Sequence, residues 1–208
     1  MSRVDIDGSW DVKVHVYSDR KAYGYGIAIV TDRTGREVFR FPVRAQGANG
    51  ANRMAYGSDT PLGTYDIPST SPWITGGSRV SYGPFARLHM EGVSGEIIDS
   101  NRSGIRIHGG RQEIEKDGVF INDPNAGLKK TLGCLRAYDS DMNLFKIITD
   151  NLTNNDSQES PGNVVVLDDL IGVTVPSSSD NFVEVKVEYS VPDDLNKKFE
   201  NIIITPVQ

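Results

Sequence analysis

The sequence predicts a mainly β protein with few helices, and two observations carry that prediction. Apolar and polar residues alternate from Trp10 to Val16 with the period of two that marks a half-buried strand, and further short strand-like runs follow. Apolar residues with helical spacing are found in one stretch, 142–152. The chain has 208 residues, 38% hydrophobic and 24% charged, which is enough for one sizeable core.

The strand pattern continues past the first run and then gives way to an irregular segment. Residues 26–30 and 37–43 read as strands, and the turn at 32–35 ends in a glycine, so the pair predicts a β-hairpin. Residues 59–83 contain prolines and glycines that break regular structure. A long irregular segment inside a compact domain is more often functional than idle.

Three more strands are expected beyond this segment, at 86–90, 96–99 and 104–108. In the last of them, Ile105 and Ile107 point to one face, while Arg106 and His108 point to the other. If the isoleucines lie in the core, Arg106 and His108 therefore face outward together.

One helix is expected in the C-terminal half. Asp139 or Ser140 can cap it. Its buried stripe would consist of Met142, Phe145, Ile148 and Leu152. The polar stretch 151–162 is expected to be a surface loop, and the continuous apolar run 164–167 a central strand.

A change in composition near the C-terminus sets the domain organisation. Residues 9–170 are predicted to form the main domain, and a Pro- and Ser-rich stretch at 176–180 marks a boundary. Apolar residues alternate again over 183–189. Residues 171–208 are therefore predicted to be a C-terminal β extension or a small accessory element, too short for independent folding to be expected.

Composition and charge exclude several classes of protein. The net charge is −6 and basic residues do not cluster, so nucleic acid is not an expected partner. No apolar run is long enough to span a bilayer, and the N-terminal residues lack the apolar core of a Sec-type signal peptide. For a protein acting outside the cytoplasm, this predicts another export route or a trimmed N-terminus.

The residues that carry chemistry are Cys134, the single cysteine, and His108. A lone Cys with a His elsewhere in the chain is typical of a thiol nucleophile and its base. An ordinary thiol, with a pKa of ~8.5, is only slightly ionised at neutral pH, so the imidazole is needed to take its proton. The thiolate can then attack an amide carbonyl and form a thioester, which an amine or water resolves.

Glycines lie next to both Cys134 and His108 in the sequence. A tight turn at 131–134 can supply backbone N–H groups to the oxyanion, and Gly133 would let a substrate approach the backbone closely. The carbonyl of Gly109 or Gly110 can fix the tautomer of the imidazole. A structural zinc site needs four ligands and the chain has one cysteine, so neither a metal nor a cofactor is expected.

At these residues the sequence resembles the L,D-transpeptidase (YkuD-like) catalytic domain of bacterial cell-wall enzymes. That family carries His-Gly or His-Ser, followed by Ser/Thr-His-Gly-Cys-hydrophobic-Asn/Arg. This chain has His108-Gly109 and then Thr131-Leu132-Gly133-Cys134-Leu135-Arg136. Two earlier segments, Thr60-Pro61-Leu62-Gly63-Thr64-Tyr65 and Tyr82-Gly83-Pro84, also match in the same order, and the resemblance covers residues 10–168.

The resemblance implies a mixed β-sandwich with a helix packed on the sheet, and it assigns roles. Cys134 would be the nucleophile, His108 the base, and Gly109 would orient that base through its carbonyl. The implied oxyanion or substrate-binding residues are Thr131, Gly133, Arg136, Arg106 and Tyr82. Arg136 would hold a substrate carboxylate or brace the loop. The implied partner is the peptide stem of peptidoglycan, in the periplasm or at the cell wall.

The chain departs from the family pattern in two places. Leu132 stands where a His is usual, and the separation between His108 and Cys134 is longer, which predicts an inserted loop at 113–129 at the mouth of the cleft. A toxin-like subgroup also lacks that His and has an Arg-Ser-Gly run, as at 102–104. A secreted antibacterial wall-modifying toxin, with an immunity or secretion partner, is therefore one alternative. An inactive cell-wall-binding module is another.

The same residues also allow simpler, purely structural interpretations. A lone Cys is most often a small buried hydrophobe, and a lone His is most often structural, which is the reading for His15 and His89. Arg136 can equally be a salt-bridge residue. Residues 60–65 are expected to be a turn leading into a strand. The choice between transpeptidation and hydrolysis stays open, because both proceed through the same thioester.

Overall fold

The structure is a computed structural model of the chain and describes residues 8–123, 126–156 and 158–170. The predicted C-terminal extension at 171–208, with its boundary at 176–180 and its alternating run at 183–189, lies outside the described residues.

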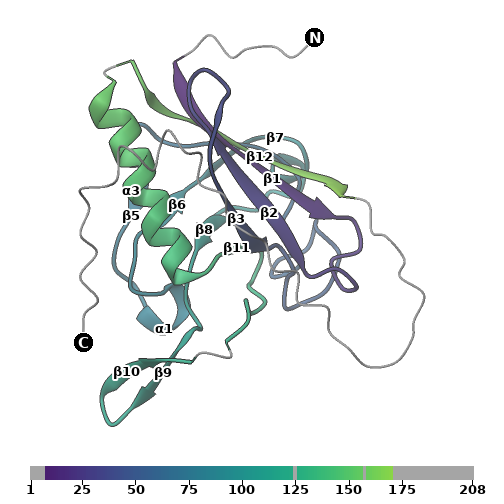
Figure 1. The fold of residues 1–208 in the computed structure, drawn as a ribbon. Helices are drawn as coiled ribbons and strands as arrows, with labels where there is room; N and C mark the ends of the chain where they lie inside the picture. The colour runs from purple at the N-terminus through teal and green to yellow at the C-terminus, as the bar shows by residue number, and fades with distance from the viewer. Residues whose placement is uncertain (1–7, 124–125, 157, 171–208) are drawn as a thin grey trace, which may run out of the picture. The chain divides into compact units, whose positions relative to one another are not determined.

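Within the described residues, the fold is built on a ten-stranded mixed sheet (Figure 1). In spatial order its strands are β5 (Trp73–Ile74), β6 (Arg87–His89), β8 (Arg106–His108), β11 (Leu135–Arg136), β3 (Glu37–Arg44), β2 (Tyr25–Thr31), β1 (Ser9–Tyr17), β12 (Ser160–Leu170), β4 (Gly63–Asp66) and β7 (Glu91–Ser94). The pairs β1–β12 and β8–β11 are parallel and the other neighbours are antiparallel. The predicted mainly β class is confirmed.

The strands expected in the first 45 residues are present, and their burial follows the sequence pattern. In β1, four alternate side chains are at most 1% exposed: Trp10, Val12, Val14 and Val16. The turn between β2 and β3 places Gly35 at φ 79°, a conformation that favours glycine. The apolar run 164–167 lies in β12, which is flanked by β1 and β4 and is therefore a central strand, as predicted.

The helix α3 (Asp139–Asn155) packs on the sheet through Phe145, and Figure 1 shows it running alongside the strands. The Phe145 ring lies 5.1 Å from the rings of Phe41 and Trp73 and 6.1 Å from that of Trp10, all between centroids. This cluster joins α3 to β1, β3 and β5. Losing such a buried aromatic side chain typically costs about 3–5 kcal/mol.

Three details of the predicted α3 are corrected. Its N-cap is Tyr138, which makes no side-chain cap hydrogen bond, and the carboxylate of Asp139 accepts from the Gly110 N–H instead of capping the helix. Its buried side chains include Thr149, whereas Ile148 and Leu152 are half-buried. The stretch 151–162 is not a loop: α3 runs to Asn155 and β12 begins at Ser160. The polar residues of this stretch suit the solvent-facing last turn of a helix as well as they suit a loop.

The strand predicted at 96–99 is wrong, since these residues form the short helix α2 (Glu96–Asp99). Gly95 precedes it at φ 85°, and the helical turn buries Ile97 (2% exposed) while leaving Ile98 51% exposed. The paired isoleucines imitate a strand, but the side chain of Glu96 bonds Arg53 and the Leu62 N–H and holds the turn. The irregular segment 59–83 also contains β4, β5 and the short helix α1 (Arg79–Tyr82).

The insertion predicted at 113–129 begins as a hairpin of β9 (Glu113–Lys116) and β10 (Val119–Asn122), which Figure 1 shows apart from the main sheet. Its turn places Asp117 at φ 54° and Gly118 at φ 78°, as a two-residue hairpin turn requires. Arg79 of α1 pairs with Glu113 and lies over the Phe120 ring, so the hairpin is tied to α1. Among the described helices, none has the length and apolar character needed to cross a bilayer.

Candidate functional site

The strands β8 and β11 bring the predicted nucleophile and base onto one face of the sheet. They pair in parallel, and their register sets Arg136 opposite His108. If the same register is followed two residues back along both segments, Cys134 lies opposite Arg106. Residues opposite each other in a ladder project to the same face, and so do residues two apart in a strand. The thiol and the imidazole thus share a face, on neighbouring segments and one diagonal step apart.

The His108 ring is fixed by a hydrogen bond to the next residue in the chain. Its Nδ1 lies 2.7 Å from the carbonyl oxygen of Gly109. A carbonyl can only accept, so Nδ1 carries the proton and, in the neutral ring, Nε2 carries the lone pair. This hydrogen bond is the one expected of Gly109.

The expectation that His108 faces outward is corrected, because its side chain is buried and the residue is 3% exposed. The ring of Tyr82 meets the imidazole edge to face, with centroids 5.0 Å apart and planes at 79°. Burial, together with the charge of Arg136, lowers the pKa of His108 to about 3. The ring is therefore neutral at physiological pH, and burial and Arg136 both disfavour its protonated form in this conformation.

Arg136 braces the loop that follows His108. It is buried, and its Nη1 donates to the carbonyls of Gly109 (2.6 Å) and Gly110 (2.8 Å), while its Nε donates to the Lys129 carbonyl (3.0 Å). These bonds correspond to the bracing role, the second of the two roles that the resemblance implies. The Gly109 carbonyl thus accepts from both His108 and Arg136.

Asp139 holds the same loop from α3, a contact that the sequence did not predict. Its Oδ1 accepts from the Gly110 N–H at 2.6 Å. A Cβ placed on Gly109 would lie 1.9 Å from that oxygen, and one on Gly83 would lie 2.2 Å from it. Gly109 and Gly83 are therefore needed for the carboxylate to approach, whereas a Cβ on Gly110 would meet the backbone of Ser81. Those glycines are the signal that could have revealed it.

The Cys134 thiol is half-buried at the end of a turn. Its Sγ–H donates to the carbonyl of Gly104 over 3.7 Å, and the backbone N–H of Arg106 donates to the sulfur. Burial raises the pKa of the thiol, while the charges of nearby arginines, Arg106 foremost, act in the opposite direction. In this conformation the thiol rests protonated on a carbonyl.

The turn before Cys134 is closed by the Thr131 hydroxyl. Thr131 Oγ1 donates to the Cys134 carbonyl (2.6 Å) and accepts from the Gly133 N–H (3.0 Å). Gly133 adopts φ 112°, where a side chain would be strained. The expectation that the Gly133 N–H lines an oxyanion hole is therefore corrected for this conformation, because that N–H is already bonded within the turn. Thr131 is placed as the residue that holds the turn.

Arg102 joins this turn to the loop before β4. It was identified in the sequence as part of an Arg-Ser-Gly run but was not predicted as a site residue. Its guanidinium donates at 2.7–3.5 Å to four backbone carbonyls, those of Arg53, Asp59, Ser58 and Leu132. A Cβ on Gly133 would lie 1.8 Å from Arg102 Nη2. The Arg102 guanidinium therefore occupies the space that a side chain at residue 133 would fill.

The remaining predicted residues are placed as follows. Arg106 is half-buried, and its Nη1 donates to the carbonyls of Met90 and Ile105, both at 2.7 Å, so its guanidinium supports the strands beside the thiol. His15 pairs with Asp169 and His89 with Glu91. All the predicted site residues thus gather around β8 and β11, with Tyr82 against His108 and Thr131 and Gly133 in the turn of Cys134.

Comparisons of the chain with protein-family models, with curated proteins and with solved structures found no match. Within the described residues, no three or more His, Cys, Asp or Glu side chains gather as metal ligands would. The arrangement that the structure offers is a neutral imidazole and a thiol on one face, among arginine charges. Such a pair is suited to nucleophilic attack with proton transfer.

Proposed function

We propose that the protein is a cysteine-dependent acyltransferase that acts on the stem peptides of peptidoglycan through a thioester, as an L,D-transpeptidase or an L,D-carboxypeptidase. The mixed sheet with α3 packed on it is then that family's β-sandwich-like fold. The observation that carries the proposal is the placement of Cys134 and His108 on one face of neighbouring segments, with Nδ1 held by the Gly109 carbonyl.

The tautomer of His108 suits it to act as a general base. Because Nδ1–H is bonded to the Gly109 carbonyl, Nε2 is the nitrogen that can take the thiol proton. In the reaction, the Sγ–H leaves the Gly104 carbonyl and gives its proton to Nε2 as the sulfur attacks the amide carbonyl carbon. The C–S bond forms, the C–N bond breaks, and the imidazolium returns the proton to the leaving amine.

The charges around the site favour the developing anion. Burial keeps both partners neutral at rest, since it raises the thiol pKa and lowers the imidazole pKa. Arg106 and Arg136 are close enough to stabilise a thiolate, so the charge that forms during attack meets a positive field. An amine acceptor then gives a cross-link, and water gives a trimmed stem. This substrate assigns the reaction to the periplasm or cell wall.

The proposal is tested by incubating the protein with disaccharide-tetrapeptide muropeptides and following the products by mass spectrometry. Wild-type protein is expected to release the terminal D-residue, with or without cross-linked dimer. Cys134→Ala is expected to reduce turnover to background and to leave the melting temperature close to that of the wild type. Turnover retained by folded Cys134→Ala would remove the thiol from the mechanism.

The alternative of an inactive wall-binding module has one observation in its favour. The thiol is protonated and bonded to Gly104, and the Gly133 N–H is engaged by Thr131. If this conformation never changes, the site cannot accommodate an oxyanion at Gly133. Purified sacculi distinguish the two functions: a binding module is retained on them without changing their muropeptides, whereas the proposed enzyme changes them.

A further inference from the structure

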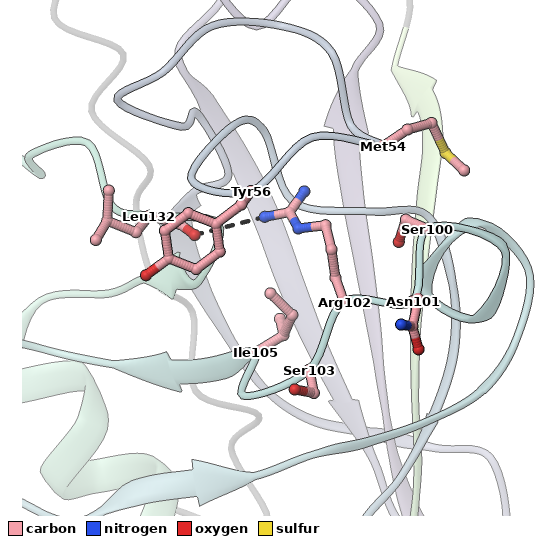
Figure 2. A pocket seen from close by; sticks show the side chains of 8 residues that line it. All are labelled: Met54, Tyr56, Ser100, Asn101, Arg102, Ser103, Ile105 and Leu132. Atoms are coloured by element: carbon pink, nitrogen blue, oxygen red, sulfur yellow. Dashed lines mark hydrogen bonds between the residues drawn. The ribbon is translucent and has the colours of Figure 1, made fainter.

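A cavity of about 240 Å³ lies between the segment that holds Met54 and Tyr56, the segment 100–105 and Leu132, and the mechanism above does not use it (Figure 2). Ile105 and Leu132 are among the residues that line it. Ile105 follows Gly104, whose carbonyl accepts the Cys134 Sγ–H, and Leu132 is two residues before Cys134. The cavity is therefore lined by residues from the two chain segments that hold Cys134 and its hydrogen-bond acceptor, while Cys134 itself is not among the lining residues.

One end of the cavity presents apolar side chains that the protein leaves uncovered. Tyr56 is 76% exposed and Leu132 is 53% exposed, and both line the cavity (Figure 2). Exposed apolar patches rimmed by polar groups commonly mark ligand-binding grooves. A tyrosine also offers a rigid flat face and loses little conformational entropy on binding.

The other lining residues offer neutral hydrogen-bonding groups. Figure 2 shows Ser100 and Asn101 at the end away from Tyr56, with Ser103 below Arg102. Asn101 and Ser103 are exposed. Hydroxyl and amide groups can both donate and accept, which suits a ligand whose own groups are hydroxyls and amides.

The charge of Arg102 does not make the cavity an anion site. Its guanidinium already donates to four backbone carbonyls, as described above, so it is not free to grip a carboxylate or phosphate in two-point fashion. No acidic side chain lines the cavity to receive an amine. The charged carboxylate and amine groups of a stem peptide therefore fit it less well than a neutral polyhydroxyl ring.

We propose that this cavity binds one pyranose ring of the peptidoglycan glycan strand, with its C–H face on Tyr56 and its polar substituents toward Ser100, Asn101 and Ser103. The inference rests on the proposed function, and it adds that the enzyme prefers stems attached to glycan over free peptides. The volume agrees with a single ring, since pockets for larger ligands run to about 300–1,000 Å³.

The kinetic test compares a free tetrapeptide with a disaccharide-tetrapeptide as donor. Wild-type protein is expected to show a KM about tenfold lower for the glycan-linked donor, the effect of one aromatic contact, with a similar kcat. Tyr56→Ala is expected to abolish the difference and to leave the free tetrapeptide unaffected. Folding is not at risk, because the Tyr56 side chain is exposed. Tyr25→Ala, at an exposed tyrosine on β2, should keep the preference.

A binding test separates this inference from the proposed function. Folded Cys134→Ala is titrated with N,N′-diacetylchitobiose, a neutral disaccharide without peptide, and amide NMR signals are followed. Signals from residues 100–105 and Leu132 are expected to shift, and not to shift when Tyr56→Ala is added. If the tetrapeptide shifts them and the disaccharide does not, the cavity is a peptide subsite and the inference is overturned. Disaccharide binding without any muropeptide turnover supports the glycan site and contradicts the proposed function.

Discussion

The base and the nucleophile of the proposed site are held in contrasting ways. His108 lies in a strand, is 3% exposed, and has its ring tied to the adjacent carbonyl. Cys134 is half-buried and ends a turn that Thr131 closes. Sheet register thus fixes the base, while a few side-chain hydrogen bonds fix the nucleophile. Substitutions of His108 should therefore alter proton transfer, and substitutions in the turn before Cys134 should alter the position of the thiol.

Between the base and the turn that positions the nucleophile, the larger effect is expected from removing the base. His108→Gln keeps a polar side chain of similar size but has no nitrogen that can accept the thiol proton. Because a positioned general base contributes about 10²–10⁴-fold, muropeptide turnover should fall by that factor. The measurement is kcat/KM on the disaccharide-tetrapeptide. His89→Gln, at a histidine paired with Glu91, is the matched control and should retain wild-type turnover.

Burial of the base also predicts how stability depends on pH. His108 has its pKa lowered to about 3 in the folded protein, against about 6.5 in an unfolded chain. Between these values the unfolded state binds the proton and the folded state does not, so stability is complete above about pH 6.5 and is lost as pH falls toward 3. The slope from this residue approaches roughly 1.4 kcal/mol per pH unit.

Urea unfolding of the wild type and of His108→Gln, from pH 7 to pH 4, isolates this contribution. Burial raises the carboxyl pKa of Asp141 to about 6, which opposes the trend, because a group that binds its proton more tightly when folded stabilises the fold on acidification. That opposing contribution is common to both proteins and cancels in their difference. Parallel curves would contradict a buried, neutral His108.

A smaller effect is expected at the turn of the nucleophile. Thr131→Val keeps the shape of the side chain but leaves the Gly133 N–H without its acceptor. An unsatisfied buried donor costs about 1–3 kcal/mol, and the displaced thiol should lower turnover by about tenfold. Urea unfolding and kcat/KM measure the two effects. Thr149→Val is the control: that hydroxyl donates to the Phe145 carbonyl within α3, so its loss should change stability little and turnover not at all.

The same contrast explains what the sequence predicted well. Strands with one buried face are recognised by the alternation of apolar and polar residues, so β1 to β3 were predicted nearly to their ends, whereas only the centre of β12, at 164–167, was predicted. Phe145 and Met142 marked the buried face of α3. The predicted partners Tyr82, Gly109 and Arg136 lie around His108, because short motifs near a strand end keep their relation when the strand is placed.

What the sequence did not predict depends on contacts between distant segments. The helix at Glu96–Asp99 is held by Arg53, which lies far away in the chain. Tyr82, from a separate segment, packs against the ring of the buried His108, so the outward-facing pattern of that residue in β8 was misleading. The bond from the Gly133 N–H to Thr131 is local by contrast, a Thr hydroxyl closing a turn two residues on, and it was not predicted.

The cavity proposed to bind a pyranose ring was not predicted, for the same reason. Tyr56, Arg102 and Leu132 belong to three separate segments, and only folding brings them together. Arg102 was noticeable as part of an Arg-Ser-Gly run, yet its role as the donor to four carbonyls follows from the loop that wraps around it.

The most direct test of the central claim, that His108 takes the proton of the Cys134 thiol, is the rate at which a carbapenem acylates the protein. The strained β-lactam carbonyl stands in for the donor amide, and intact-mass spectra follow the adduct over time at pH 7. We expect one adduct, mapped to Cys134 by peptide analysis, that forms about 10²–10⁴-fold more slowly in His108→Gln. No adduct on wild-type protein after prolonged incubation, or equal rates in the two proteins, would contradict the pairing.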